Sequence, residues 1–255
     1  MLHKKIYNYL SNISFNNKIL VKTHKNFCKL FYFRKEKFFR KISNNKIGAL
    51  RLVSDRDGLT WYCKLIKRNN KKIIKNFYKN GNNAYLDTFQ INGYQIKSWN
   101  SLEKNYQYIV KILSHYRKYF PRKKISHIHG DLTFDNIFFI KNDLFIIDWE
   151  FFRSNKNLYG YDLAYLILSS LCIPYITKKK RSILDEKLFI SLWRHLIKLK
   201  VNKTIIYDPF VFFEKNIKKD KFLKANFKLS KSKFYPFLVN LKYKKIIKKM
   251  IKEKI

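Results

Sequence analysis

The sequence predicts an α+β protein in two lobes, a small antiparallel β-sheet lobe with one helix followed by a mainly helical lobe. Short aromatic and β-branched runs separated by polar turns occupy roughly the first ninety residues, as in antiparallel strands. Beyond them, apolar residues recur every three or four positions, which is the period of helices with one buried face. With 255 residues and 46% hydrophobic content, the chain can form two modest cores. The Ile91-Asn92-Gly93-Tyr94 break gives predicted lobes of residues 1–91 and 92–255.

The amino-terminal lobe should combine short strands with a single helix. A helical spacing of apolar residues begins at Ile47 and stops before the polar run 68–72. The Lys79-Asn80-Gly81-Asn82 turn predicts a hairpin, because Gly81 can take the positive φ that such turns need. The predicted strands are residues 19–21, 27–33, 37–43, 73–78 and 84–89.

The carboxy-terminal lobe should be mainly helical. Residues 101–120 carry apolar side chains on one face, and Pro121 ends this helix. Two apolar runs, 137–140 and 144–147, flank Asn142-Asp143 and predict a tight hairpin. Further helices are expected from about Asp162, in several segments after Lys178, and as a basic amphipathic segment at 242–255.

The chain is strongly basic, with 56 Lys and Arg against 17 Asp and Glu and a formal charge of +39. Such a charge ordinarily indicates a polyanionic partner. Here the lysines are spread over nearly the whole length and accompany many Asn, Ile, Phe and Tyr residues, as base-composition drift would produce. We therefore expect a solvated basic surface, no specific nucleic-acid partner, and at most a weak association with anionic membrane surfaces.

Cysteine usage and hydropathy favour a cytoplasmic protein. Cys28, Cys63 and Cys172 are far apart and form no Cys-x-x-Cys pair, so neither a disulfide framework nor a zinc site is supported. Lysines and asparagines interrupt the residues after Met1, and no uncharged apolar run approaches the length of a membrane span.

Acidic residues gather in one stretch of this basic chain. Between Ile125 and Glu150, Lys141 is the only Lys or Arg. Asp131, Asn136 and Asp148 lie at the ends of the predicted strands, where we expect them to face one small space. Oxygen ligands of this kind suit a hard cation such as Mg²⁺. Phosphoryl transfer to a hydroxyl needs the same parts, a carboxylate that accepts the proton and an amide and carboxylate that hold metal ions.

Three motifs in this order resemble those of the aminoglycoside phosphotransferase and choline kinase superfamily, which has a protein-kinase-like fold. His129-Gly130-Asp131-Leu132-Thr133-Phe134-Asp135-Asn136 resembles its catalytic loop. Ile147-Asp148-Trp149-Glu150 resembles its metal-binding segment, and Gly160-Tyr161-Asp162-Leu163-Ala164 the segment that follows.

The resemblance implies a small-molecule kinase that uses ATP and Mg²⁺, with the nucleotide bound by the first lobe and a hydroxyl acceptor by the second. Asp131 would be the catalytic base, and Asn136 and Asp148 would be the Mg²⁺ ligands. His129 would brace the loop through hydrogen bonds, and Asp162 would hold the loop backbone from a helix start.

The resemblance also implies a lysine on the third strand that contacts the nucleotide phosphates, with an acidic partner on the next helix. Lys41 is the candidate, and Arg40 and Lys64 are alternatives. The helix offers only Asp55 and Asp57, both shorter than the expected Glu, and we assign Asp57 to the ATP site. Ser54 with Asp57 could instead form a helix cap.

The nucleotide site otherwise departs from the family pattern. No glycine-rich loop is present, so the turn Thr23-His24-Lys25-Asn26 would have to hold the phosphates through backbone N–H groups. The family's usual geometry places adenine against the backbone near residues 89–91, with Ile91 as a contact.

Glu150 and Phe151 are the predicted acceptor-binding residues. An acid at position 150 resembles the choline, ethanolamine and thiamine kinase-like members, whose acceptors are cationic. A carboxylate beside an aromatic ring could hold an ammonium group by ion pairing and cation–π contact. Glu150 could equally pair with Arg153 or a lysine, and sugar acceptors stay open.

Two other functions compete with the kinase. His127-Ile128-His129-Gly130-Asp131 could begin a His-x-His-x-Asp metal-dependent hydrolase site, although this leaves Asn136 and Asp148 unexplained. The missing glycines would also suit a kinase-like binding protein with little or no catalysis. Tightly held zinc would favour the hydrolase, and ATP-dependent Mg²⁺ binding would favour the kinase.

Overall fold

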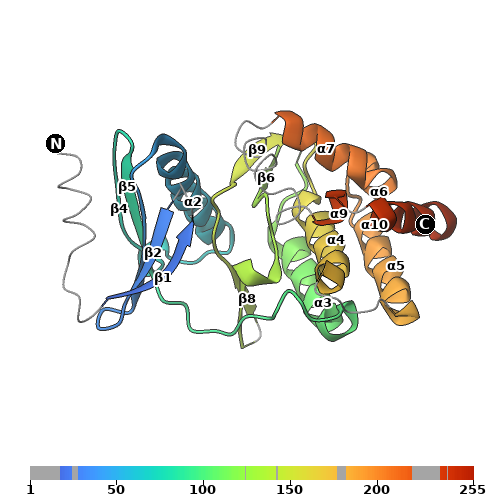
Figure 1. The fold of residues 1–255 in the computed structure, drawn as a ribbon, viewed down its shortest axis with the longest axis horizontal. Coiled ribbons are helices and arrows are strands. Elements are labelled where there is room, and N and C mark those ends of the chain that lie inside the picture. The colour runs from blue at the N-terminus through green and yellow to red at the C-terminus, as the bar shows by residue number, and fades with distance from the viewer. Residues whose placement is uncertain are drawn as a thin grey trace. The chain divides into compact units, whose positions relative to one another are not determined.

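The structure is a computed structural model that describes residues 18–24, 28–123, 125–141, 143–176, 182–219, 236–239 and 241–255. The chain divides into two compact units (Figure 1). The first comprises Met1–Asn92 together with Asp148–Phe152, and the second Gly93–Ile147 with Arg153–Ile255. A short segment late in the sequence is therefore part of the amino-terminal unit.

The first unit is an antiparallel five-stranded sheet in the order β1-β2-β3-β5-β4, with helix α2 against one face (Figure 1). This arrangement confirms the predicted sheet with one helix. The elements are β1 Lys18–His24, β2 Cys28–Phe33, β3 Phe38–Ser43, α2 Lys46–Leu65, the 3₁₀ turn η2 Asn70–Lys72, β4 Ile74–Asn80 and β5 Asn83–Phe89.

Local chemistry explains the boundaries of these elements. Asn45 caps α2, because its side chain accepts a hydrogen bond from the Gly48 N–H at 2.8 Å. Ser54 and Asp57 lie inside this helix, so the alternative in which they cap it is wrong. Gly81 has φ of 55° in the β4–β5 turn, which confirms the conformation predicted for it.

The second unit is mainly helical, as predicted. Its helices are α3 Leu102–Tyr119, α4 Tyr161–Ile176, α5 Ile183–Lys198, α6 Lys203–Tyr207, α7 Pro209–Lys219, α9 Pro236–Val239 and α10 Leu241–Lys254. Two small antiparallel pairs accompany them, β6 Ile125–Ile128 with β9 Arg153–Lys156 and β7 Ile137–Ile140 with β8 Asp143–Ile146. The β7–β8 pair confirms the predicted hairpin, whereas the β6–β9 pair was not predicted.

Helix α4 forms the centre of the second unit's core. Its side chains from Leu163 to Cys172 are buried all round, so the helix lacks the polar face of a surface helix. Helices α3 and α5 pack against it. Trp193 on α5 is fully buried, and its indole N–H donates to the Ile206 carbonyl at 3.0 Å, so it is a core residue.

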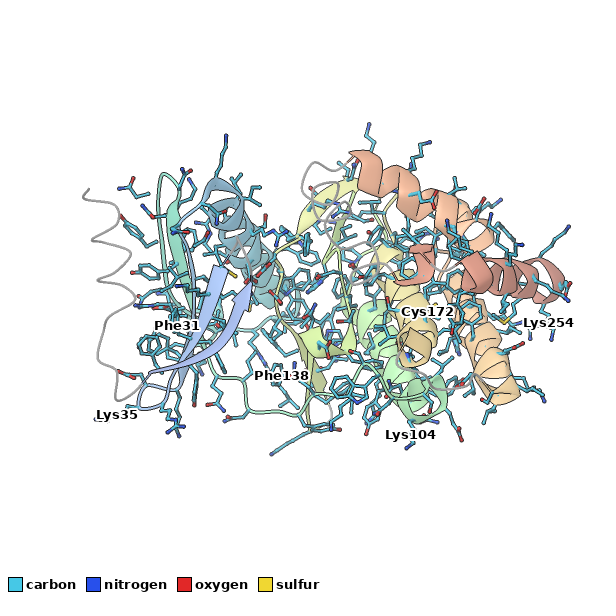
Figure 2. The ribbon with its side chains drawn as sticks, in the orientation of Figure 1. Phe31, Lys35, Lys104, Phe138, Cys172 and Lys254 are labelled. Carbon is cyan, nitrogen blue, oxygen red and sulfur yellow. The ribbon has the colours of Figure 1, made fainter. Side chains whose placement is uncertain are left out.

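Exposed lysines occur in both units. Lys35, Lys104 and Lys254 are exposed and lie at the periphery of their own units (Figure 2). Within the described ranges, the structure contains no helix with the length and apolar character needed to cross a lipid bilayer.

Candidate active site

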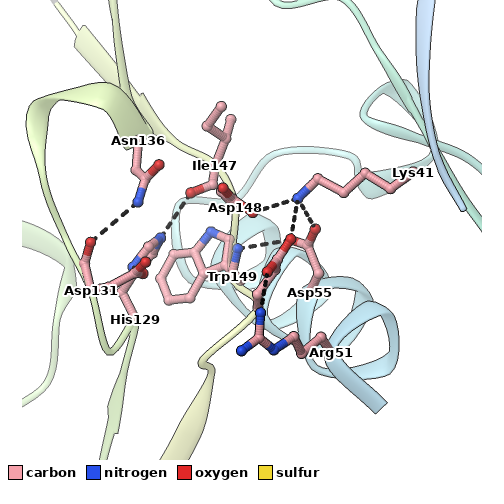
Figure 3. Close-up of polar contacts among 10 residues, drawn as sticks. Lys41, Arg51, Asp55, His129, Asp131, Asn136, Ile147, Asp148 and Trp149 are labelled. Atoms are coloured by element: carbon pink, nitrogen blue, oxygen red, sulfur yellow. Dashed lines mark hydrogen bonds and ion pairs between the residues drawn. The ribbon is translucent and has the colours of Figure 1, made fainter. Parts of the chain in front are cut away.

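Lys41 on β3 is the centre of a charged cluster in the first unit (Figure 3). Its ammonium donates to Asp55 Oδ2 at 2.6 Å and forms an ion pair with Asp148. Glu150 Oε1 lies 3.4 Å from the same nitrogen. Lys41 and Asp148 are 107 residues apart in the chain, so the fold, not local sequence, brings them together. The alternatives Arg40 and Lys64 do not take this position, since Arg40 forms a buried pair with Asp87 and Lys64 is exposed.

Asp55, not Asp57, is the acidic partner of Lys41 on α2. Asp55 is 1% exposed, and its second carboxylate oxygen accepts a hydrogen bond from the Trp149 N–H at 2.8 Å. Asp57 pairs instead with Arg56 at the surface, at 2.6 Å. The assignment of Asp57 to the lysine is wrong, because two residues further along a helix point to a different face.

Asp148 has an unusual backbone conformation. Its φ is 65°, in the left-handed region that residues other than glycine rarely adopt. Strained residues of this kind concentrate at functional sites, where the surrounding structure holds them in place. In this chain the hydrogen bond from the next residue, Trp149, to Asp55 and the ion pair with Lys41 hold Asp148 from both sides.

The charges of this cluster depend on one another. Burial lowers the pKa of Lys41, but Asp148, Asp55 and Glu150 more than offset this and raise it well above its usual value, so Lys41 stays charged. Burial raises the pKa of Glu150 to about 7, with Asp148 adding to the increase and Lys41 opposing it. Burial also raises the pKa of Asp55 against the effect of Lys41.

The predicted catalytic loop, residues 129–136, lies in the second unit and is held by Asp162 at the start of α4. The Asp162 carboxylate accepts hydrogen bonds from the backbone N–H groups of His129 at 2.8 Å and Gly130 at 2.9 Å. These are the hydrogen bonds expected of Asp162. Gly130 has φ of 99°, which allows the tight turn that aims both N–H groups at one side chain.

His129 is buried between acceptors on both sides of its ring. Nε2 lies 2.8 Å from the Ile147 carbonyl oxygen, and Nδ1 lies 3.0 Å from Asp131 Oδ1 (Figure 3). Burial in itself lowers the pKa of His129, but Asp131, Asp162 and the carbonyl raise it to about 9. His129 is therefore an imidazolium at neutral pH, and its positive charge faces the Asp131 carboxylate.

Asn136 and Asp148 offer oxygen atoms that suit Mg²⁺. Asn136 Nδ2 donates to the Asp131 carbonyl at 3.2 Å, so the amide oxygen is the atom that this side chain can offer to a cation. Hard cations prefer such amide and carboxylate oxygens. The convergence of Asp131, Asn136 and Asp148 in one space stays a prediction, because the first two belong to one unit and the third to the other.

The remaining predicted site residues have these positions. Ile91 follows β5 and is partly buried. Glu150 and Phe151 lie in the segment of the first unit, where Arg51 contacts both, with Nη1 3.7 Å from Glu150 Oε2 and its guanidinium carbon 5.0 Å from the Phe151 ring centre. Their role toward an acceptor stays a prediction. Lys25 and Asn26 of the expected phosphate turn lie outside the described residues.

The hydrolase interpretation finds no support in the described part of the chain. The side chains there that come close enough to share a cation are Asp55, Asp148 and Glu150, and none is a histidine. His129 already contacts the Ile147 carbonyl and Asp131 through its two ring nitrogens.

The sequence reasoning missed Arg51. It lies one turn before Asp55 on the same face of α2 and is 6% exposed. The spacing of Arg51 four residues before Asp55 was a usable signal in the sequence, because residues at this spacing share a helix face.

A small antiparallel sheet with one helix, followed by a mainly helical unit, is the protein-kinase-like fold. Amicoumacin kinase is similar to this chain with a TM-score of 0.54 and 10% identity, over 98% of this chain and 92% of its own. This similarity confirms the fold that the resemblance implied.

Two other solved structures are similar with lower TM-scores. An aminoglycoside-3'-phosphotransferase of type VIII has a TM-score of 0.48 and 10% identity, over 76% of this chain and 100% of its own. A choline/ethanolamine kinase family protein from Mesorhizobium loti has 0.36 and 9%, over 98% of this chain and 99% of its own. No protein-family model matches the sequence, and no curated protein does so.

Proposed function

We propose that the protein is an ATP-dependent phosphotransferase that moves the γ-phosphate of ATP to a hydroxyl group of a small molecule. The observation that carries this proposal is the pairing of Lys41 on β3 with Asp148 and with Asp55 on α2. A kinase needs a phosphate-contacting lysine, its acidic partner and a metal-binding aspartate in one cluster. The fold shared with amicoumacin kinase, whose solved structure holds AMP-PNP and Ca²⁺, supports the same conclusion.

Asp131 acts as the base of this reaction. The acceptor hydroxyl gives its proton to the Asp131 carboxylate while its oxygen forms a bond to the γ-phosphorus. The bond from that phosphorus to the oxygen bridging the β- and γ-phosphates breaks, and ADP leaves with this electron pair. The His129 imidazolium, with Nδ1 3.0 Å from Asp131 Oδ1, places a positive charge beside the base and holds it in position in the loop.

Asn136 and Asp148 would hold Mg²⁺, and Lys41 would bind the phosphates of ATP. When bound, the metal neutralises charge on the transferring phosphate. The donor set fits this role, because Asp148 carries carboxylate oxygens and the Asn136 amide N–H is already used within the loop. The acceptor class is a small alcohol, either an amino alcohol of the choline, ethanolamine or thiamine type or a sugar.

Nucleotide binding and turnover should be tested separately. Thermal unfolding of the wild-type protein should shift upward with ATP and Mg²⁺, and Asp148→Ala should lose the metal-dependent part of this shift. An acceptor screen should then measure ADP formation with alcohols, amino alcohols and sugars.

Asp131→Asn provides the decisive variant. It should keep the ATP-dependent shift and lower turnover by about 10²- to 10⁴-fold, because it removes the proton acceptor alone. Wild-type turnover in this variant would contradict the assignment of the base. ATP binding without ADP formation from any acceptor would favour the kinase-like binding protein.

A further inference from the structure

Helix α2 holds three consecutive residues of the 148–152 segment, all within the first unit. Asp55 accepts a hydrogen bond from the Trp149 N–H at 2.8 Å. Arg51, one turn earlier on the helix, lies 3.7 Å from Glu150 and stacks its guanidinium 5.0 Å from the Phe151 ring centre. Helix α2 therefore holds the backbone of the 148–152 segment and also two of the segment's side chains.

Glu150 uses its two carboxylate oxygens on two cations of its own unit. Oε1 lies 3.4 Å from Lys41 Nζ, and Oε2 lies 3.7 Å from Arg51 Nη1. The Glu150 side chain is only 12% exposed. A cationic acceptor would have to compete with both partners, so this carboxylate is placed to act on Lys41 rather than on the acceptor.

The bonding of Asp55 on α2 explains why a second carboxylate is useful. Asp55 contacts Lys41 with one carboxylate oxygen at 2.6 Å, and its other oxygen accepts from the Trp149 N–H, so it offers the ammonium a single acceptor. A lysine ammonium has three N–H donors, and Lys41 has three carboxylate neighbours, Asp55, Asp148 and Glu150. If Asp148 turns to a metal ion, Asp55 and Glu150 are the two that still hold the lysine.

The charges of the cluster agree with this division. Two cations, Lys41 and Arg51, face the three carboxylates, which leaves one net negative charge when all are ionised. A buried cluster with an excess carboxylate is suited to a further cation. Lys41 and Arg51 balance two of the three carboxylates, so one negative charge remains in the cluster that contains Asp148, the predicted metal ligand.

We propose that Glu150 is a positioning residue for Lys41: held by Arg51, it supplies a second carboxylate to the lysine beside Asp55, whose other oxygen is bound to the Trp149 N–H. The inference rests on the proposed function, because it assumes that Lys41 contacts the nucleotide phosphates. It replaces the acceptor-binding role for Glu150 with a role in nucleotide binding.

The test measures ATP affinity by titration calorimetry at two Mg²⁺ concentrations, one that saturates the wild-type protein and one tenfold higher. Glu150→Gln keeps the size of the side chain and should raise the ATP dissociation constant about tenfold, as expected for the loss of one charged partner. Glu36→Gln, an exposed glutamate in the β2–β3 turn of the same unit, is the matched control and should leave it unchanged. Arg51→Gln should also raise the ATP dissociation constant, by a smaller factor than Glu150→Gln. This second variant tests the proposal if Glu150→Gln does not fold.

A double-mutant cycle separates positioning from a general structural effect. In a Lys41→Met background, Glu150→Gln should have no further effect on ATP affinity, because the residue through which it acts is absent. An equal tenfold loss in that background would overturn the proposal. The proposal would also be overturned if Glu150→Gln left the ATP affinity unchanged and raised the KM for the acceptor. A loss of ATP affinity in Glu150→Gln that the higher Mg²⁺ concentration restores would overturn it as well, because a metal ligand would behave in this way.

The outcomes also separate this inference from the proposed function. If the wild-type protein does not bind ATP, both fail. If the wild type binds ATP and Glu150→Gln binds it equally well, only the positioning role fails.

Discussion

The charged state of His129 has a measurable consequence for stability. Its pKa is raised from the usual 6.5 to about 9, since Asp131, Asp162 and the Ile147 carbonyl together outweigh the effect of burial. A histidine with a raised folded-state pKa stabilises the protein fully below its unfolded-state pKa. This contribution is lost as the pH rises through the folded-state pKa. The relevant window therefore runs from about pH 6.5 to pH 9.

The size of the effect follows from the two pKa values. The difference between pKa values of 6.5 and about 9 corresponds to a contribution of about 3 kcal/mol to the free energy of unfolding. We expect the wild-type protein to lose about 3 kcal/mol of stability between pH 6 and pH 9.5 through this residue. Other groups titrate in the same interval, including Glu150 near its lower end, so a comparison with a variant is needed.

Urea unfolding of the wild type and His129→Gln at a series of pH values measures this contribution. The stability difference between them should be largest at pH 6 and should shrink by about 3 kcal/mol by pH 9.5, because groups common to both cancel. NMR of the histidine ring should show a titration near pH 9. A pH-independent difference, or a His129 titration at 6.5 or below, would refute the imidazolium.

Two further substitutions test the supports of the site. Asp162→Ala should lower the free energy of unfolding by about 3 kcal/mol or more in urea titrations, because the buried N–H groups of His129 and Gly130 lose a charged acceptor. A loss below about 1 kcal/mol would show that the loop does not depend on Asp162. Gly58→Ala should cost about 1 to 3 kcal/mol in the same titrations, because its Cβ would lie 2.4 Å from the Trp149 Cβ. An unchanged or higher stability would contradict this close approach between α2 and the 148–152 segment.

The candidate site residues of the second unit could be predicted because each lies in a short sequence motif. The predicted catalytic loop, the hairpin that follows and the start of α4 are continuous stretches with strong patterns, and the residues of each motif lie within a few positions of one another. Asp162 and its backbone partners are 32 and 33 residues apart, yet both segments carried their own motifs.

In the first unit, the sequence did not decide which face of α2 meets Lys41. Asp55 and Asp57 are equally acidic and both lie in the predicted helix, and a capping role favoured neither. The face of α2 that meets Lys41 is decided by burial of Leu52, Leu59 and Tyr62 against the rest of the unit. Asp55 shares that face with Arg51, and Asp57 does not.

The segment from Asp148 to Phe152 could not be assigned to the first unit by pattern alone, because the chain enters it from a hairpin of the second. Its attachment comes from contacts between residues about one hundred positions apart, of which the Trp149 N–H to Asp55 hydrogen bond is one. The fully buried Trp149 side chain and the Arg51–Glu150 pair are others. These contacts give Glu150 a reason to be acidic that needs no cationic acceptor. Glu150, which the sequence associated with the acceptor, lies in this structure against Lys41 and Arg51 of the first unit.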